Sequence, residues 1–141
     1  MLAHKAEIEA NKIIHGCLKK KFNINYINLP NLVFTYPEIS TVGLSEEELN
    51  YLNISNFKNS HYFLNNSKSL IYSDGKGFLK ILYCSSNKRI LGACIFNSIA
   101  SELIYSITTI IYYKGTLSDL LNIISPHPTI SEIFKEFILY K

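Results

Sequence analysis

Of the four histidines in the chain, His127 has the surroundings best suited to acid–base chemistry. It lies in the segment Ser125-Pro-His-Pro-Thr-Ile-Ser-Glu132, where prolines on both sides restrict the backbone next to the ring. A helix is predicted to begin directly afterwards, which places the imidazole beside a positive helix N-terminus. Glu132 can reach back to one ring nitrogen, fix the tautomer and stabilise the imidazolium, while the other nitrogen acts as a general base.

The same segment has a purely structural interpretation. Thr129-Ile-Ser-Glu132 is a capping-box sequence, which starts a helix without any catalytic role. A His–Glu pair with no nucleophile, cofactor loop or second acid is also incomplete as an active site. If the pair is catalytic, the remaining groups must come from another domain or another chain. His4, His15 and His61 stand among ordinary residues and are predicted to be surface or core side chains.

Composition excludes several classes of function. The chain has 141 residues, of which 48% are hydrophobic, so it is long enough to bury a core. A net charge of +3 and one short lysine run at residues 19–21 give no case for nucleic acid binding. Cys17, Cys84 and Cys94 form no Cys-x-x-Cys pair, so neither a disulfide framework nor a metal site is predicted.

No membrane association is predicted either. The first ten residues are polar and acidic, unlike a secretory signal peptide. The longest apolar stretch, residues 99–113, is interrupted by polar side chains and is shorter than the roughly 20 residues that a membrane span needs. It is predicted to be a buried helix or a subunit interface.

Hydrophobic periodicity and turn signals predict the elements that must position His127. A first helix is expected over residues 2–15, and a short helix is expected to start at the capping box of Ser45 and Glu48. β-rich runs occur at residues 31–36, 61–64, 69–72, 78–83 and 90–96. Three further helices are expected at residues 98–113, 116–122 and 130–140. Strands followed by helices in blocks indicate an α+β fold, with an antiparallel sheet of about four to five strands packed with helices.

Several motifs together resemble one known family. They are Met-Leu-Ala-His-Lys-Ala-Glu at residues 1–7, Phe-Thr-Tyr-Pro-Glu-Ile at 34–39, Val-Gly at 42–43, Ser-Glu-Glu-Glu-Leu at 45–49, Asn-Ser at 66–67, Asp-Gly-Lys-Gly at 74–77 leading to Lys-Ile at 80–81, Arg-Ile-Leu-Gly at 89–92, and His-Pro-Thr-Ile-Ser-Glu at 127–132. Across essentially all residues the chain resembles the C-terminal dimerisation domain of the flavin-dependent pyridine nucleotide-disulphide oxidoreductases. The first motif favours the dihydrolipoamide dehydrogenase branch over a sister glutathione or mercuric reductase.

The resemblance implies an obligate homodimer in which each subunit completes the other's active site. Residues 1–22 are then the end of the FAD-binding domain and a linking helix, and residues 23–141 are the dimerisation domain. By the same resemblance His127 is the acid–base residue for the dihydrolipoamide thiol, and Glu132 orients it. Electrons pass through a disulfide to FAD and then to NAD+. The implied flavin contacts are Met1, Leu2, Ala3, His4, His127 and Pro128, with the His127–Pro128 bond expected to be cis.

The substrate and the location are also implied by the resemblance. The substrate is dihydrolipoamide on the lipoyl domain of a 2-oxoacid dehydrogenase or glycine cleavage complex. The location is mitochondrial or plastid in a eukaryote and cytoplasmic in a bacterium. Two positions and one stretch depart from the family. Pro126 replaces a small residue, Tyr36 replaces a histidine, and residues 97–102 lack the usual glycine-rich turn but keep its glutamate.

The family's glycine-rich dinucleotide loops and its Cys-x4-Cys disulfide are absent from the chain. We therefore expect a fragment cut inside the FAD-binding domain, which alone binds neither FAD nor NAD usefully and catalyses nothing. The alternative left open by the residues is a non-catalytic homodimerising interaction domain, in which the histidine segment only caps a helix.

Overall fold

A five-stranded antiparallel sheet forms the centre of the molecule, in the order β1-β2-β5-β4-β3. The computed structural model describes residues 2–73 and 75–140. The strands are β1 (Asn31–Val33), β2 (Glu38–Gly43), β3 (Asn56–Tyr62), β4 (Phe78–Cys84) and β5 (Ile90–Asn97). A tight connection between β4 and β5 sets their register, with Phe78 opposite Phe96 and Ile81 opposite Ala93.

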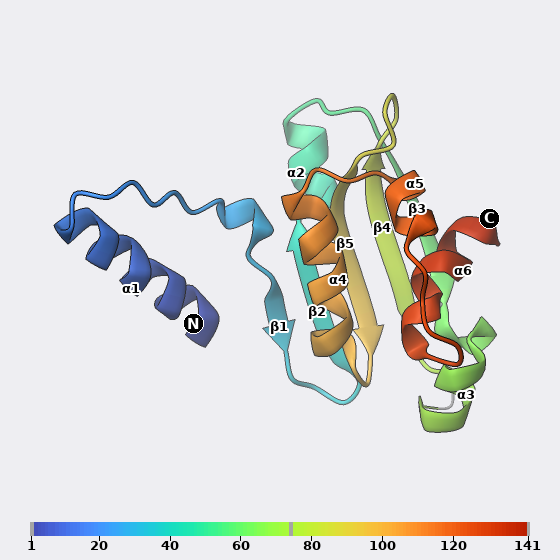
Figure 1. The fold of residues 1–141 in the computed structure, drawn as a ribbon. Coiled ribbons are helices and arrows are strands. Elements are labelled where there is room, and N and C mark those ends of the chain that lie inside the picture. The colour runs from blue at the N-terminus through green and yellow to red at the C-terminus, as the bar shows by residue number, and fades with distance from the viewer. Residues whose placement is uncertain (1, 74, 141) are drawn as a thin grey trace.

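Helices cover one face of this sheet (Figure 1). They are α4 (Ala100–Tyr112), α5 (Leu117–Asn122) and α6 (Ile133–Leu139), with the 3-10 turn η3 (Ile130–Glu132) directly before α6. Shorter elements link the strands: α2 (Glu46–Tyr51), η2 (Phe63–Asn65) and α3 (Ser67–Ser73). The α4 helix packs on β2 and β5, whereas α6 packs on β3 and β4.

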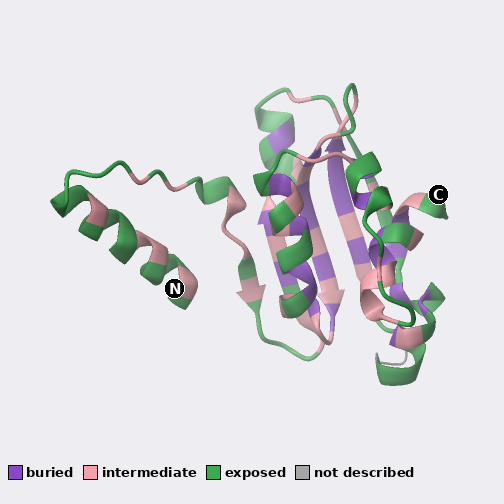
Figure 2. Ribbon diagram, viewed as in Figure 1, coloured by how far each residue is buried: buried purple, intermediate pink, exposed green. Residues whose placement is uncertain are grey.

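The core lies between the sheet and these helices, as the buried stripes in Figure 2 show. Apolar residues of α4 recur at helical spacing, so that Ile104, Ile107 and Ile111 are all buried against the sheet. Ile81 and Ile95 face them from the central strands. Each such side chain contributes roughly 1.5–3 kcal/mol when fully buried, so this layer holds the elements around His127 in place.

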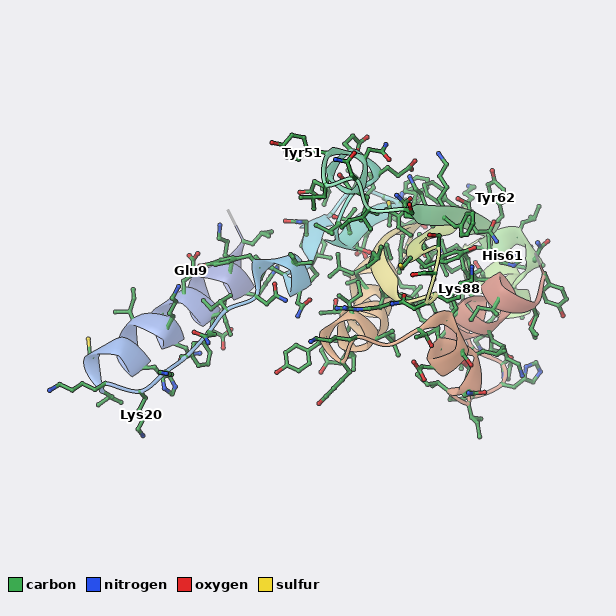
Figure 3. All side chains as sticks on the ribbon, turned by 90° about the horizontal axis from the view of Figure 1, so that it is seen from above. Glu9, Lys20, Tyr51, His61, Tyr62 and Lys88 are labelled. Atoms are coloured by element: carbon green, nitrogen blue, oxygen red, sulfur yellow. The ribbon has the colours of Figure 1, made fainter. Side chains whose placement is uncertain are left out.

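The first helix, α1 (Ala3–Cys17), stands away from the sheet and has no buried residue. Figures 1 and 3 show it separated from the sheet by an extended connection that includes the 3-10 turn η1 (Tyr26–Asn28). Polar contacts link it to that connection: the Tyr26 hydroxyl donates to Glu9 at 3.1 Å.

The α+β class, the antiparallel sheet, the predicted helices and the Ser45–Glu48 capping box are confirmed. The strand predicted at residues 69–72 is wrong, because this segment belongs to α3. Asn66 caps that helix: its side-chain oxygen accepts from the Ser69 N–H at 2.9 Å. The turn predicted at residues 74–77 follows α3 rather than joining two strands, and Asp74 lies outside the described residues.

The strand β2 was not predicted, because a polar residue occupies one of its inward positions. Ser40 is fully buried and donates to the carbonyl of Ala100 at 2.9 Å. This breaks the apolar alternation by which a strand is recognised in a sequence. The predicted strand at residues 31–36 ends at Val33. Of the strand predicted at residues 61–64, only residues 61–62 are strand, at the end of β3, and residues 63–64 belong to η2.

Candidate functional site

The structure brings His127 and Glu132 together on the loop before α6. His127 Nδ1 lies 2.9 Å from Oε1 and 3.2 Å from Oε2 of the Glu132 carboxylate. The His127–Pro128 peptide bond is cis, as the resemblance implied. The His127 side chain is 76% exposed and that of Glu132 only 21%, so the carboxylate is sheltered behind a ring that faces outward.

Thr129 holds the Glu132 carboxylate in this position. Its N–H donates to Glu132 Oε2 at 2.9 Å, and its hydroxyl donates to the Pro126 carbonyl at 2.7 Å. The hydrogen bond from Thr129 and the contact with His127 lower the pKa of the Glu132 carboxyl. The predicted capping box is therefore present, and the same carboxylate serves both the cap and the histidine.

This arrangement decides which nitrogen of His127 can act as a base. An ionised carboxylate only accepts hydrogen bonds, so Nδ1 carries the proton that points at Glu132. In the neutral ring the lone pair is then on Nε2, on the side away from the carboxylate. A proton taken up at Nε2 gives an imidazolium whose charge Glu132 stabilises, so the pair has the geometry of a general base and its orienting carboxylate.

The other predicted cofactor-binding residues lie at the start of α1. Leu2 is the residue before the first turn, Ala3 begins the helix, and His4 Nε2 lies 2.8 Å from the Pro30 carbonyl. Met1 lies outside the described residues. This end of α1 is beside β1, whereas the His127 loop lies on the α6 side of the sheet (Figure 1). One chain therefore does not bring the two groups of predicted residues together.

An open apolar groove of about 300 Å³ lies next to the His127 loop, between α4 and the segment that follows α5. Tyr105, Ile124 and Pro126 line it. Tyr105 and Ile124 are 75% and 93% exposed. The sequence pointed to the α4 region as a possible interface but not to Ile124. The signal was available as two successive isoleucines, Ile123 and Ile124, directly before the proline-flanked histidine.

Beneath the loop lies a buried polar cluster that the sequence did not reveal. His61 on β3 is 5% exposed and Asn66 is fully buried, and both are near Glu136 on α6. Figure 3 shows His61 between the β3–α3 region and α6. Burial lowers the pKa of His61 and raises the pKa of Glu136.

Two negative findings apply to residues 2–73 and 75–140. Within these ranges no group of three or more His, Cys, Asp or Glu side chains is arranged to hold a metal ion. None of the helices described there is both long and apolar enough to cross a membrane.

Comparison with known proteins defines the family. Residues 29–138 match the family described as "Pyridine nucleotide-disulphide oxidoreductase, dimerisation domain". The chain therefore belongs to this family.

Among its relatives are mitochondrial dihydrolipoyl dehydrogenases. The chain is 36% identical to that of Dictyostelium discoideum and 35% identical to that of Caenorhabditis elegans, over 136 residues in each case. These alignments cover 96% of this chain but 28% of either relative. The chain thus spans little more than a quarter of their length.

Solved structures show the same fold. LpdA from Mycobacterium tuberculosis superposes with a TM-score of 0.87 at 24% identity, covering 96% of this chain and 30% of that one. The HOCl-induced flavoprotein disulfide reductase RclA from Escherichia coli gives 0.79 at 23% identity, covering 92% and 31%.

Proposed function

We propose that this chain is the dimerisation domain of a dihydrolipoyl dehydrogenase and supplies His127 and Glu132 to the active site of a partner subunit. The observation that carries the proposal is the 2.9 Å contact between Nδ1 and the carboxylate, on a ring that is otherwise exposed. The identity to dihydrolipoyl dehydrogenases supports the choice of substrate. That substrate is dihydrolipoamide on the lipoyl domain of a 2-oxoacid dehydrogenase or glycine cleavage complex.

In this proposal His127 moves the proton of the substrate thiol. Nε2 accepts a proton from dihydrolipoamide, which leaves a thiolate, the form of sulfur that attacks a disulfide. Glu132 holds the imidazolium until the proton is returned. When the partner subunit covers the ring, exclusion of water strengthens the attraction between the imidazolium and the carboxylate, so docking and catalysis are linked.

The FAD and NAD+ of the complete enzyme supply the electron-transfer chemistry. On this chain we assign flavin contacts to Met1, Leu2, Ala3 and His4 on one side, and to His127 and Pro128 on the other. The start of α1 fits this role because the first N–H groups of a helix have no partner within the helix and favour negative groups.

We propose a second copy of this chain as the occupant of the groove beside Ile124. The family is defined as a dimerisation domain, and the groove adjoins the loop that must reach a partner's active site. The names of the relatives also favour a mitochondrial location.

A chimera tests the proposal. The chain replaces the matching segment of the Dictyostelium discoideum relative, and His127→Gln is compared with the unchanged chimera and with His15→Gln. We expect His127→Gln to reduce the oxidation of dihydrolipoamide by a factor on the order of 10²–10⁴, with the same FAD content, and His15→Gln to have no effect. Unchanged turnover in His127→Gln would overturn the assignment.

Two further observations separate the alternatives. A chimera that binds FAD but oxidises glutathione or reduces mercuric ion in preference to lipoamide would identify a sister reductase. The isolated chain of 141 residues is expected to be colourless and unable to reduce NAD+ with dihydrolipoamide. A yellow, active preparation would contradict the two-chain site.

A further inference from the structure

A continuous set of hydrogen bonds links the exposed His127 loop to the buried cluster beneath it. The side-chain amide of Asn66 donates to the Thr129 carbonyl at 3.3 Å and to Glu136 Oε1 at 3.0 Å. Thr129 in turn donates its N–H to Glu132, and Glu132 contacts His127. The Thr129 carbonyl is thus held by Asn66, and the Thr129 N–H by Glu132.

We propose that Asn66, braced by Glu136, is a positioning residue that holds the Thr129 backbone so that Glu132 is aimed at His127 Nδ1. The proposal rests on the proposed function for its catalytic meaning. Its structural content, which is the orientation of the imidazole, can be measured without it.

The burial of Asn66 is what makes this role effective. Asn66 is fully buried, and its two amide hydrogens and its oxygen all have partners, the oxygen accepting from Ser69. A buried amide with all its partners has one favourable orientation, since any rotation leaves a donor or acceptor unpaired. The exposed ring of His127 lacks such packing, so its orientation depends on its contact with Glu132, which is held in turn by the Thr129 N–H.

Glu136 also faces β3. Its Oε2 lies 3.9 Å from Nε2 of the buried His61, and the desolvated carboxyl takes its hydrogen bond from Asn66. Asn66, the residue before α3, therefore bridges the Thr129 carbonyl and the Glu136 carboxylate on α6.

The chain offers variants that separate positioning from helix capping. Asn66→Ala removes both the contacts to Thr129 and Glu136 and the cap on α3. Asn66→Asp keeps an oxygen for the Ser69 N–H but replaces the donor that faces Thr129 and Glu136. Glu136→Gln keeps an acceptor for Asn66. Asn97→Ala is the matched control, because Asn97 is also fully buried and also bridges two backbone groups, the Lys76 carbonyl and the Ile99 N–H.

The measurement is the ratio of the Nδ1–H to the Nε2–H tautomer of His127, read from imidazole ¹⁵N shifts in the chain of 141 residues. We expect the Nδ1–H form to dominate in the unchanged chain. Because the tautomer is selected by a hydrogen bond to a charged group, the ratio should fall by roughly three- to tenfold in Asn66→Ala and Asn66→Asp. Asn97→Ala and Glu136→Gln should stay within about twofold of the unchanged chain.

An unchanged ratio in Asn66→Asp would overturn the proposal, and so would an equal fall in Asn97→Ala. In the chimera, Asn66→Asp should lower kcat by a similar factor with little change in KM or FAD content. If His127→Gln leaves turnover intact, the proposed function fails, whereas the tautomer ratio still decides whether Asn66 positions the ring.

Discussion

Replacement of Ile124 by alanine is expected to weaken the proposed homodimer. Ile124 is 93% exposed in the single chain and borders the groove between α4 and the His127 loop. Because the side chain makes so little contact within its own chain, Ile124→Ala should leave the free energy of unfolding of the monomer within about 0.5 kcal/mol. A change in association is then attributable to the interface alone.

The expected size follows from burial and symmetry. Burying an isoleucine side chain is worth roughly 1.5–3 kcal/mol relative to leaving it exposed, and alanine retains part of this. In a two-fold symmetric dimer the substitution is present on both subunits, so the loss is about 2–5 kcal/mol. At about 1.4 kcal/mol per tenfold change, the dissociation constant should rise roughly 30- to 3,000-fold.

Sedimentation equilibrium over a concentration series measures this constant directly. Ile71→Ala is the matched control, because Ile71 is 74% exposed but lies on α3, away from the groove. We expect the control to keep the dissociation constant of the unchanged chain within about twofold. The reasoning is refuted if Ile124→Ala associates as the unchanged chain does, or if both variants lose association equally.

Three more outcomes are expected. In the chimera, Glu132→Gln should reduce turnover by roughly tenfold, because the base remains but its imidazolium loses a charged partner. This loss should be smaller than that of His127→Gln, and equal losses of turnover in steady-state assays would contradict the prediction. Burial lowers the pKa of His61 below its ordinary 6.5, so the unfolded chain binds the proton more tightly and stability falls as pH drops through that value. His61→Phe removes this proton uptake. As the pH falls from about 7.5 to about 5.5, the melting temperature of His61→Phe should therefore rise relative to that of the unchanged chain. A difference in melting temperature that does not change with pH would count against the burial effect. Gly77→Ala should lower the melting temperature, because Gly77 has φ +110° and an added Cβ would lie 1.8 Å from the Phe96 carbonyl oxygen. Gly16→Ala in α1, where the added Cβ meets nothing within 4 Å, should be neutral or stabilising by up to about 1 kcal/mol. Equal changes in melting temperature for the two variants would refute the steric argument.

The features that the sequence predicted well depend on neighbouring residues. Thr116 caps α5 through Asp119, three residues on, and Ser45 caps α2 through Glu48 in the same way. His127 and Glu132 are only five residues apart, so a proline-fixed loop followed by a helical turn is enough to bring them together. Side chains this close in the chain can be paired from spacing and capping chemistry alone.

The features that were missed depend on distant contacts. Asn66 bonds to a carbonyl 63 residues away and to a carboxylate 70 residues away, and nothing in the local sequence marks these partners. His61 looks ordinary in the sequence because its burial beside Glu136 depends on α6, which packs on β3 although all five strands precede it in the chain. The resemblance to the family implied the candidate site, but the hydrogen bonds beneath it are visible only in the fold.

The separation of the two predicted flavin contacts is the strongest structural argument for a two-chain site. The start of α1 lies beside β1, and the His127 loop lies across the sheet by α6 (Figure 1). The buried core of strands and α4 lies between them, and a single chain in this structure does not bring both to one cofactor. In the proposed two-fold symmetric pair, α1 of one copy and the His127 loop of the other would contact the same flavin, and the partner chain would cover each exposed histidine.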